Sequence, residues 1–103
     1  MIYLASPYSH PSREVMELRF KLTRHYGAGC LRMHLLIISP IVYCHQFADQ
    51  GTTAESWTFL NNELMSMCDK LWVLQLDGWK ESRGVAEEIK AFHLRGIEPE
   101  FKG

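Results

Sequence analysis

The chain has 103 residues, with 11 Lys and Arg against 12 Asp and Glu, which gives a formal net charge of −1 with His neutral. This balance excludes a protein that binds nucleic acid through a broad basic surface. A composition of 47% hydrophobic and 22% charged residues excludes a disordered or fibrous chain. We expect one domain that spans residues 1–103.

The cysteines and the apolar runs indicate in which compartment the protein is expected. Cys30, Cys44 and Cys68 form no Cys-x-x-Cys pair, which is typical of reduced thiols rather than of a disulfide framework. No apolar run approaches the roughly 20 residues that a membrane-spanning helix requires, and no basic segment precedes an apolar one at the N-terminus. We therefore expect a soluble, unexported, cytoplasmic protein.

The first half of the chain predicts strand, helix and strand. Residues Met1–Ala5 form an apolar run that stops at Ser6-Pro7 and is typical of a buried strand. Apolar residues then recur at helical spacing to about Met33, weakened by Gly27 and Gly29. Leu35–Ser39 is a second apolar run. Because proline has no amide hydrogen, Pro40 should end that strand, and we expect a loop after it.

The second half repeats the alternation. A helix is predicted from about Ala54 to Met67, followed by a strand over Leu71–Leu76. Ser82 is the expected N-cap of a third helix, which should end near Arg95-Gly96, where glycine can adopt the left-handed conformation. Ile97–Phe101 is a candidate last strand.

Strands separated by helices require crossover connections, which favour a parallel sheet. We predict a small α/β fold with a doubly wound, mainly parallel sheet of four to five strands and helices on both faces. Ligands of such folds bind beyond the carboxyl ends of the strands, where the strand order reverses. This rule points to three segments: Ser6–Ser9, Ser39–His45 and Asp77–Gly84.

Helical geometry distinguishes two adjacent acidic residues in the third helix. At about 100° per residue, Val85, Ile89 and Phe92 share one face, which should contact the sheet. Glu88 then falls at the edge of that buried face and Glu87 on the solvent side. Glu88 should be partly desolvated, either as a functional carboxylate or as the partner of a Lys or Arg at the rim.

Other polar residues near these segments also have two interpretations. Ser82 and Gly84 could bind an anion at the helix N-terminus, or Ser82 could serve as a cap alone. Tyr3, Ser6 and Tyr8 could hold a sugar and a base, although Tyr3 could equally be a core aromatic residue. Neither a P-loop nor a Gly-x-Gly-x-x-Gly motif is present, and the histidines lack metal-binding spacing, so we expect no ATP, NAD, other cofactor or metal.

Three segments together resemble a known family. They are Ile2–Ser9, Ser39–Ile41 with His45, and Cys68–Leu74 continuing through Gly78–Glu88. They are similar to a small single-domain branch of the nucleoside 2-deoxyribosyltransferase-like superfamily, which also contains the 2′-deoxynucleoside 5′-monophosphate N-glycosidases. The resemblance to the enzymes rests on the tyrosine of the first strand and on the pattern Ser-x-Gly-x-x-x-Glu at Ser82, Gly84 and Glu88.

The resemblance implies a function and roles for individual residues. Glu88 would be the nucleophile at the anomeric carbon, and Tyr3 would orient it. Residues Ser6–Ser9, including Tyr8, would line the sugar pocket, and Ser82 would hold a 5′-phosphate. The partner would be a nucleoside or nucleotide, with no membrane or nucleic acid, and the chain would form a homodimer or an assembly of dimers.

One position departs from the family pattern. Members carry an Asp eight residues before the Asp that opens the third strand, and here that position is Asn61. An amide can bind a base but cannot protonate it, so Asp77 or Glu81 would take that part, or the base would leave without acid help. Asn61 also supports an alternative function, a nucleotide-binding or regulatory module without turnover.

Overall fold

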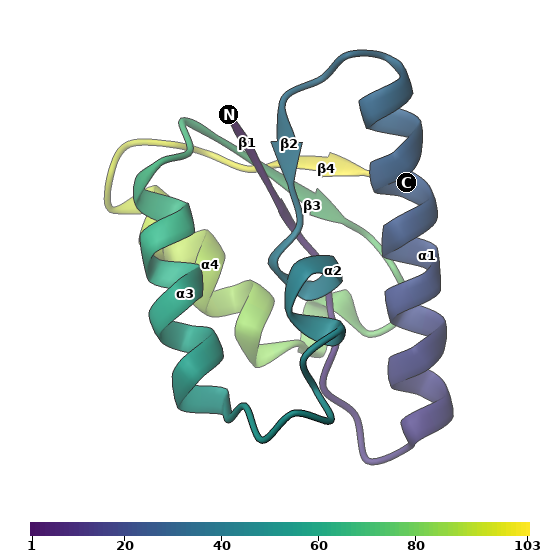
Figure 1. The fold of residues 1–103 in the computed structure, drawn as a ribbon. Helices are drawn as coiled ribbons and strands as arrows, with labels where there is room; N and C mark the ends of the chain where they lie inside the picture. Colours follow the sequence, from purple (N-terminus) through teal and green to yellow (C-terminus); the bar gives the residue numbers. More distant parts are fainter.

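The computed structural model describes residues 1–103 as a four-stranded parallel sheet with helices on both faces (Figure 1). The strands are β1 (Ile2–Ala5), β2 (Ile37–Ile38), β3 (Lys70–Leu74) and β4 (Glu100–Lys102). The helices are α1 (Arg13–Arg32), α2 (Pro40–His45), α3 (Ala54–Ser66) and α4 (Arg83–His93), with a 3₁₀ turn, η1, over Trp79–Glu81. This confirms the predicted α/β class and its parallel sheet.

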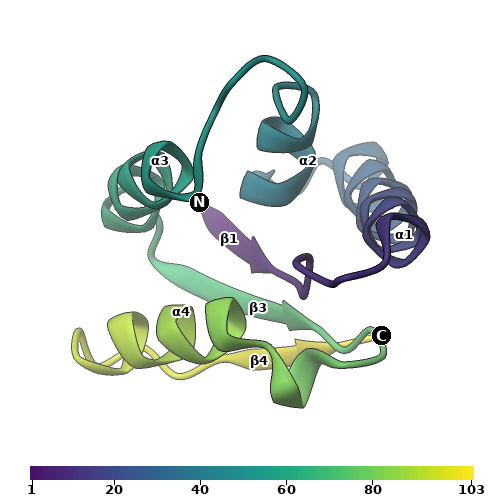
Figure 2. The ribbon, with the colours of Figure 1, turned by 90° about the horizontal axis from the view of Figure 1, so that it is seen from below.

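The strand order is β2-β1-β3-β4, and every neighbouring pair is parallel. Tyr3 pairs with Ile38 on one side and with Leu71 on the other. Right-handed crossovers place α1 on one face and α3 and α4 on the other, as seen along the sheet in Figure 2. The chain leaves β1 toward β2 and later returns to the opposite side of β1 as β3, so the order reverses between β1 and β3. The loops after these two strands therefore border the expected ligand-binding edge.

The core lies between the sheet and the two helices α3 and α4, which cover one of its faces. Alternate residues of β1 and β3 point to this side, and they pack against Val85 and Phe92 of α4. Tyr3 is fully buried, and its ring centroid lies 5.6 Å from that of Phe92. All four residues of β1 are buried, as the continuous apolar run predicts for a central parallel strand.

Every helix begins after a Ser or Thr whose hydroxyl accepts a hydrogen bond from a first-turn amide, at 3.2 to 3.4 Å. The N-caps are Ser12, Ser39, Thr53 and Ser82. The cap at Ser82 was predicted. The helix after Ser39 was not, because Pro40 was interpreted only as the end of a strand followed by a loop. Proline at the first helical position, directly after a capping serine, favours a helix start, and that signal was present in the sequence.

The strands are shorter than predicted. The pairing in β2 is limited to Ile37–Ile38, and β3 ends at Leu74 rather than Leu76. The amide of Leu76 donates a hydrogen bond to the carbonyl oxygen of Leu74. The chain therefore leaves the sheet before the apolar run ends. The last strand begins at Glu100, three residues later than predicted, because the turn after α4 continues to Gly96 (φ 77°) and residues 97–99 do not pair with β3.

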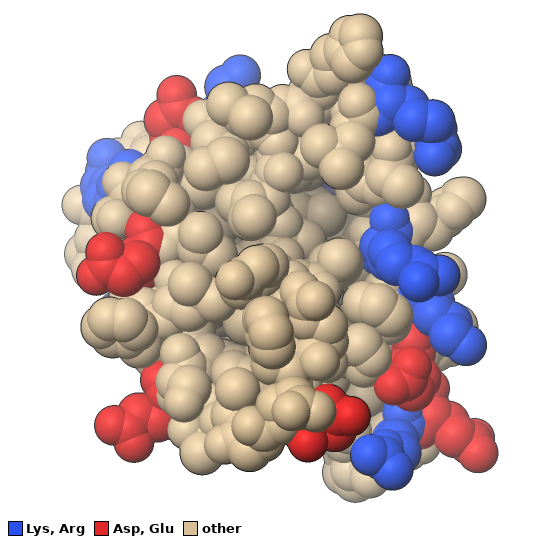
Figure 3. Space-filling model, in the orientation of Figure 1, with Lys and Arg blue, Asp and Glu red and all other residues tan.

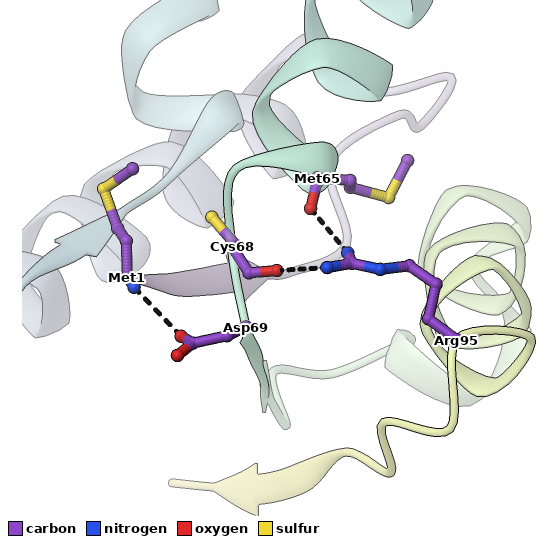
Figure 4. Close-up of polar contacts among 5 residues, drawn as sticks. All are labelled: Met1, Met65, Cys68, Asp69 and Arg95. Carbon is purple, nitrogen blue, oxygen red and sulfur yellow. Dashed lines mark hydrogen bonds and ion pairs between the residues drawn. The ribbon is translucent and has the colours of Figure 1, made fainter.

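The amino-terminal edge of the sheet is fixed by polar contacts at the opposite end from the expected site (Figure 4). The Arg95 guanidinium donates to the carbonyl oxygens of Met65 at 2.7 Å and Cys68 at 2.8 Å. These bonds join the end of α4 to the end of α3. The terminal amino group of Met1 lies 3.0 Å from an oxygen of Asp69 and lowers the pKa of that carboxyl.

Candidate functional site

A tyrosine and a glutamate from elements far apart in the sequence meet inside the fold. The Tyr3 hydroxyl donates a hydrogen bond to Oε2 of Glu88, which lies in the second turn of α4. Tyr3 comes from the strand at the centre of the sheet, so both ends of this contact are fixed by the core. Glu87 projects outward instead and pairs with Arg83 at 3.2 Å. The helical geometry therefore separated the two carboxylates correctly.

Burial dominates the electrostatics of Glu88. Loss of water raises its pKa from 4.5 to about 7, against the hydrogen bond from Tyr3, which lowers it, while nearby Glu87 raises it further. No lysine or arginine pairs with the carboxylate, so the interpretation of Glu88 as one half of a rim ion pair is wrong. Burial and Glu88 likewise raise the pKa of Tyr3, which keeps its hydroxyl protonated as a donor.

The start of α4 leaves room for a ligand next to its backbone. Ser82 accepts from the amide of Val85 at 3.2 Å, so its hydroxyl caps the helix and its hydrogen remains available. A Cβ atom at Gly84 would meet nothing closer than the Ser82 hydroxyl, at 3.9 Å. Packing within the chain therefore does not require glycine at this exposed position. Both interpretations of Ser82, as a cap and as an anion ligand, are compatible with this geometry.

Ser6 and Tyr8 follow β1 but point to different partners. Ser6 is buried and accepts a hydrogen bond from Thr23 of α1 at 3.2 Å, so it lies toward α1. The Tyr8 ring lies 5.5 Å from the ring of Trp57, at the start of α3. Tyr8 is thus the residue of this segment that reaches α3.

Asn61 carries the one buried side-chain oxygen or nitrogen that lacks a hydrogen-bond partner within the chain, its Oδ1. Trp57, Asn61 and Leu64 follow one another at helical spacing, so they share a face of α3. Trp57 contacts Tyr8, and Leu64 packs against the core cluster that contains Tyr3. Asn61 therefore lies on the face of α3 that packs toward the core. A buried amide oxygen in this position is suited to accept a hydrogen bond from a ligand.

Asp77 lies apart from Glu88. Its backbone oxygen accepts from Arg19 at 3.2 Å, and its side chain borders a pocket of ≈ 570 Å³ on the α1 side, which neither Tyr3 nor Glu88 lines. Arg19 also donates to the carbonyls of Tyr8 and Ser9, at 3.3 and 3.0 Å. This arginine ties the loop after β1 to the loop after β3. Gly78 (φ 89°) permits its approach, because a Cβ there would lie 2.5 Å from the Arg19 Nη2 atom.

Two residues of this region, Glu17 and Arg19, were not found from the sequence, and His45 was included only as part of the segment Ser39–His45, with no role of its own. The Tyr8 hydroxyl lies 2.9 Å from Nδ1 of His45, and Nε2 of His45 lies 3.1 Å from Oε1 of Glu17. Glu17 and His45 lie 9 and 37 residues from Tyr8 along the chain, so no local motif marks them. The topology rule did include both Tyr8 and His45 in the segments expected near a ligand.

No helix of the structure is both long enough and apolar enough to cross a membrane.

No curated protein matches the chain. A family model does match residues 1–99, which is nearly the whole chain. The protein therefore belongs to the family described as "Domain of unknown function (DUF1937)".

Proposed function

We propose that the protein cleaves the N-glycosidic bond of a 2′-deoxynucleoside or its 5′-monophosphate, with Glu88 as the nucleophile. The observation that carries this proposal is the partly buried contact between Tyr3 and Glu88, with no cation on the carboxylate. A carboxylate held in this way can stabilise the positive charge that develops at the anomeric carbon and then bond to that carbon. Water as acceptor gives hydrolysis, and a second base gives deoxyribosyl transfer.

The surrounding residues fit the parts of such a substrate. Asn61 offers an unpartnered amide oxygen to the base, and Tyr8 with Trp57 offers aromatic surface. The amides at the start of α4, next to Ser82 and Gly84, suit a 5′-phosphate because a helix N-terminus favours an anion. Ser6 already accepts a hydrogen bond from Thr23 of α1, so it supports the loop after β1 rather than binding the substrate.

A nucleotide-binding module without turnover is the second candidate. Asn61 favours it, because an amide cannot deliver a proton to the leaving base. Asp77 and Glu81 are both exposed, and Asp77 belongs to the pocket on the α1 side. The two candidates differ in one outcome: the module binds a deoxynucleoside monophosphate and returns it intact.

The test is release of free base from a panel of deoxynucleosides and their 5′-monophosphates, followed by chromatography. Glu88→Gln keeps the size of the side chain and removes the nucleophile, so release should fall by about 10³-fold or more. Glu87→Gln is the matched control on the adjacent, exposed position and should leave the rate unchanged. Saturable binding without release would favour the binding module, and equal rates for Glu88→Gln and wild type would disprove the assignment of the nucleophile.

The proposal also includes a homodimer, or an assembly of dimers. Lys and Arg side chains lie along the side formed by α1, whereas uncharged side chains cover the middle of the face shown in Figure 3. Exposed aromatic residues occur on α2, on the turn after it and on α3, at Tyr43, Phe47 and Phe59. A chain of this size gains buried apolar surface by covering them with a second copy.

A further inference from the structure

A second polar arrangement, partly buried, lies beyond the carboxyl end of β1. Tyr8 of the loop after β1, His45 at the end of α2 and Glu17 of α1 form one continuous chain, with distances of 2.9 and 3.1 Å between successive groups. Three separate elements contribute to it. A chain of this type conducts a proton between its two ends without moving heavy atoms.

The imidazole in the middle is held in a fixed plane. The Phe20 ring stacks on it at 3.8 Å with 17° between the planes, and the Tyr8 ring meets it edge-on at 5.8 Å. Each ring nitrogen has one partner, so both protons of an imidazolium are accommodated. Burial, together with nearby Glu17, raises the pKa of Tyr8, so its phenol retains the proton at neutral pH.

The outer end of the chain reaches the proposed base-binding position. Trp57 contacts Tyr8, and Asn61 lies four residues further along the same face of α3. Four residues of helix span about 6 Å, so Asn61 lies one turn further along α3 than the tryptophan that contacts Tyr8. The proposal requires a base at the Asn61 amide to extend back along this face as far as the Tyr8 hydroxyl.

We propose that Tyr8, His45 and Glu17 form the proton relay that serves the leaving base and then the acceptor water. The inference rests on the proposed function, and it supplies the acid that Asn61 cannot be. Tyr8 is the catalytic residue of the relay, since in this proposal its hydroxyl donates to the base. His45 and Glu17 act through Tyr8 and are positioning residues.

The relay begins with protonated His45 between the Glu17 carboxylate and the Tyr8 oxygen. An oxygen of Glu88 bonds to the anomeric carbon, the C–N bond breaks, and its electron pair stays on the base. The base nitrogen takes the Tyr8 proton, and the Tyr8 oxygen takes a proton from Nδ1 of His45.

In the second step water attacks the anomeric carbon and the ester bond to Glu88 breaks. The proton lost by water passes to Tyr8, while the Tyr8 proton returns to His45. Each group thereby recovers its starting state, and the sum is N-glycoside plus water giving free base plus sugar.

The test compares two leaving groups in the same variants. Tyr8→Phe should lower kcat/KM for an ordinary purine deoxynucleoside monophosphate by about 10²- to 10⁴-fold, the range for loss of a general acid. An N7-methylated purine carries a positive charge and leaves as a neutral base without a proton, so its cleavage should change little. Activity on this second substrate also shows that the variant is folded. Tyr26→Phe is the control, because Tyr26 lies in the second half of α1 and is not part of the chain from Tyr8 to Glu17.

Glu17→Gln should show the same selective loss, with Glu14→Gln as its control on the exposed first turn of α1. Equal losses on both leaving groups, or no loss on either, would overturn the relay while leaving Glu88 in place. Wild-type protein that releases no base from either substrate would overturn the proposed function itself, and the relay with it.

Discussion

Glu88 lowers the stability of the folded state when its carboxyl group is ionised. A buried carboxyl with no cation is expensive to ionise, and here burial raises its pKa to about 7. Between pH 4.5 and 7 the folded state binds more protons than the unfolded state. The contribution of this group to stability is thus fully present below pH 4.5 and is lost as the pH rises through about 7. Natural proteins retain such groups mainly where chemistry uses them.

We predict that Glu88→Gln stabilises the protein at alkaline pH. Glutamine has no charge to desolvate and can still accept the Tyr3 hydrogen bond, so the free energy of unfolding at pH 8 should rise by about 3 kcal/mol. At pH 5 the gain should be small. Urea unfolding across this range measures the difference. Glu87→Gln is the control, and an equal pH dependence in Glu88→Gln and wild type would show that Glu88 ionises as an exposed carboxyl does.

The helices could be predicted from the sequence where a capping residue and a periodic apolar face occur together. The helix starts at Ser12, Thr53 and Ser82 combine a capping hydroxyl with a periodic apolar face, and α4 presents Glu88 at the edge of that face as predicted. The α2 helix was missed because six residues show no period, and the lengths of β2 and β3 depend on strand pairing rather than on local pattern. The left-handed backbone of His34 (φ 59°) likewise comes from the turn between α1 and β2.

The start of α4 gives a prediction at this scale. Gly84→Ala should stabilise the helix, by up to about 1 kcal/mol, because alanine costs less backbone entropy and the added Cβ meets no close neighbour. The same methyl group would stand where a phosphate approaches the backbone, so KM for a deoxynucleoside monophosphate should rise more than KM for the unphosphorylated nucleoside. Thermal unfolding and steady-state kinetics measure both effects.

Gly27→Ala in α1 is the matched control, because a Cβ there meets no atom within 4 Å and Gly27 lies far from α4 in the sequence. This variant should gain stability with unchanged KM for both substrates. A KM for the monophosphate that is unaffected by Gly84→Ala would place the phosphate elsewhere.

At the scale of the whole molecule, the sheet topology brings together side chains that lie far apart in the sequence. The order reversal between β1 and β3 could be expected from alternating strands and helices, and it indicated the loops that carry Tyr8, His45 and Ser82. The contacts of Tyr8 with His45, of His45 with Glu17 and of Arg19 with two loops could not be predicted, because they join side chains from separate elements in three dimensions.

The exposed aromatic residues give a prediction for the assembled protein. Light scattering at micromolar concentration should give a mass of at least twice 12.0 kDa. Phe59 is 71% exposed, and Phe59→Lys should reduce the mass to that of one chain because a charge would be buried at the interface. Leu94→Lys, at a residue 78% exposed at the end of α4, is the control and should leave the mass unchanged. A wild-type mass equal to one chain would contradict the dimer.

The most direct test of the covalent mechanism is peptide mass spectrometry after brief incubation with deoxynucleosides and their monophosphates. The account predicts a deoxyribosyl or deoxyribosyl-phosphate adduct on the α4 peptide, assigned to Glu88 and missing in Glu88→Gln. Release of base by the wild type with the adduct on any other residue, or with the adduct undiminished in Glu88→Gln, would contradict it.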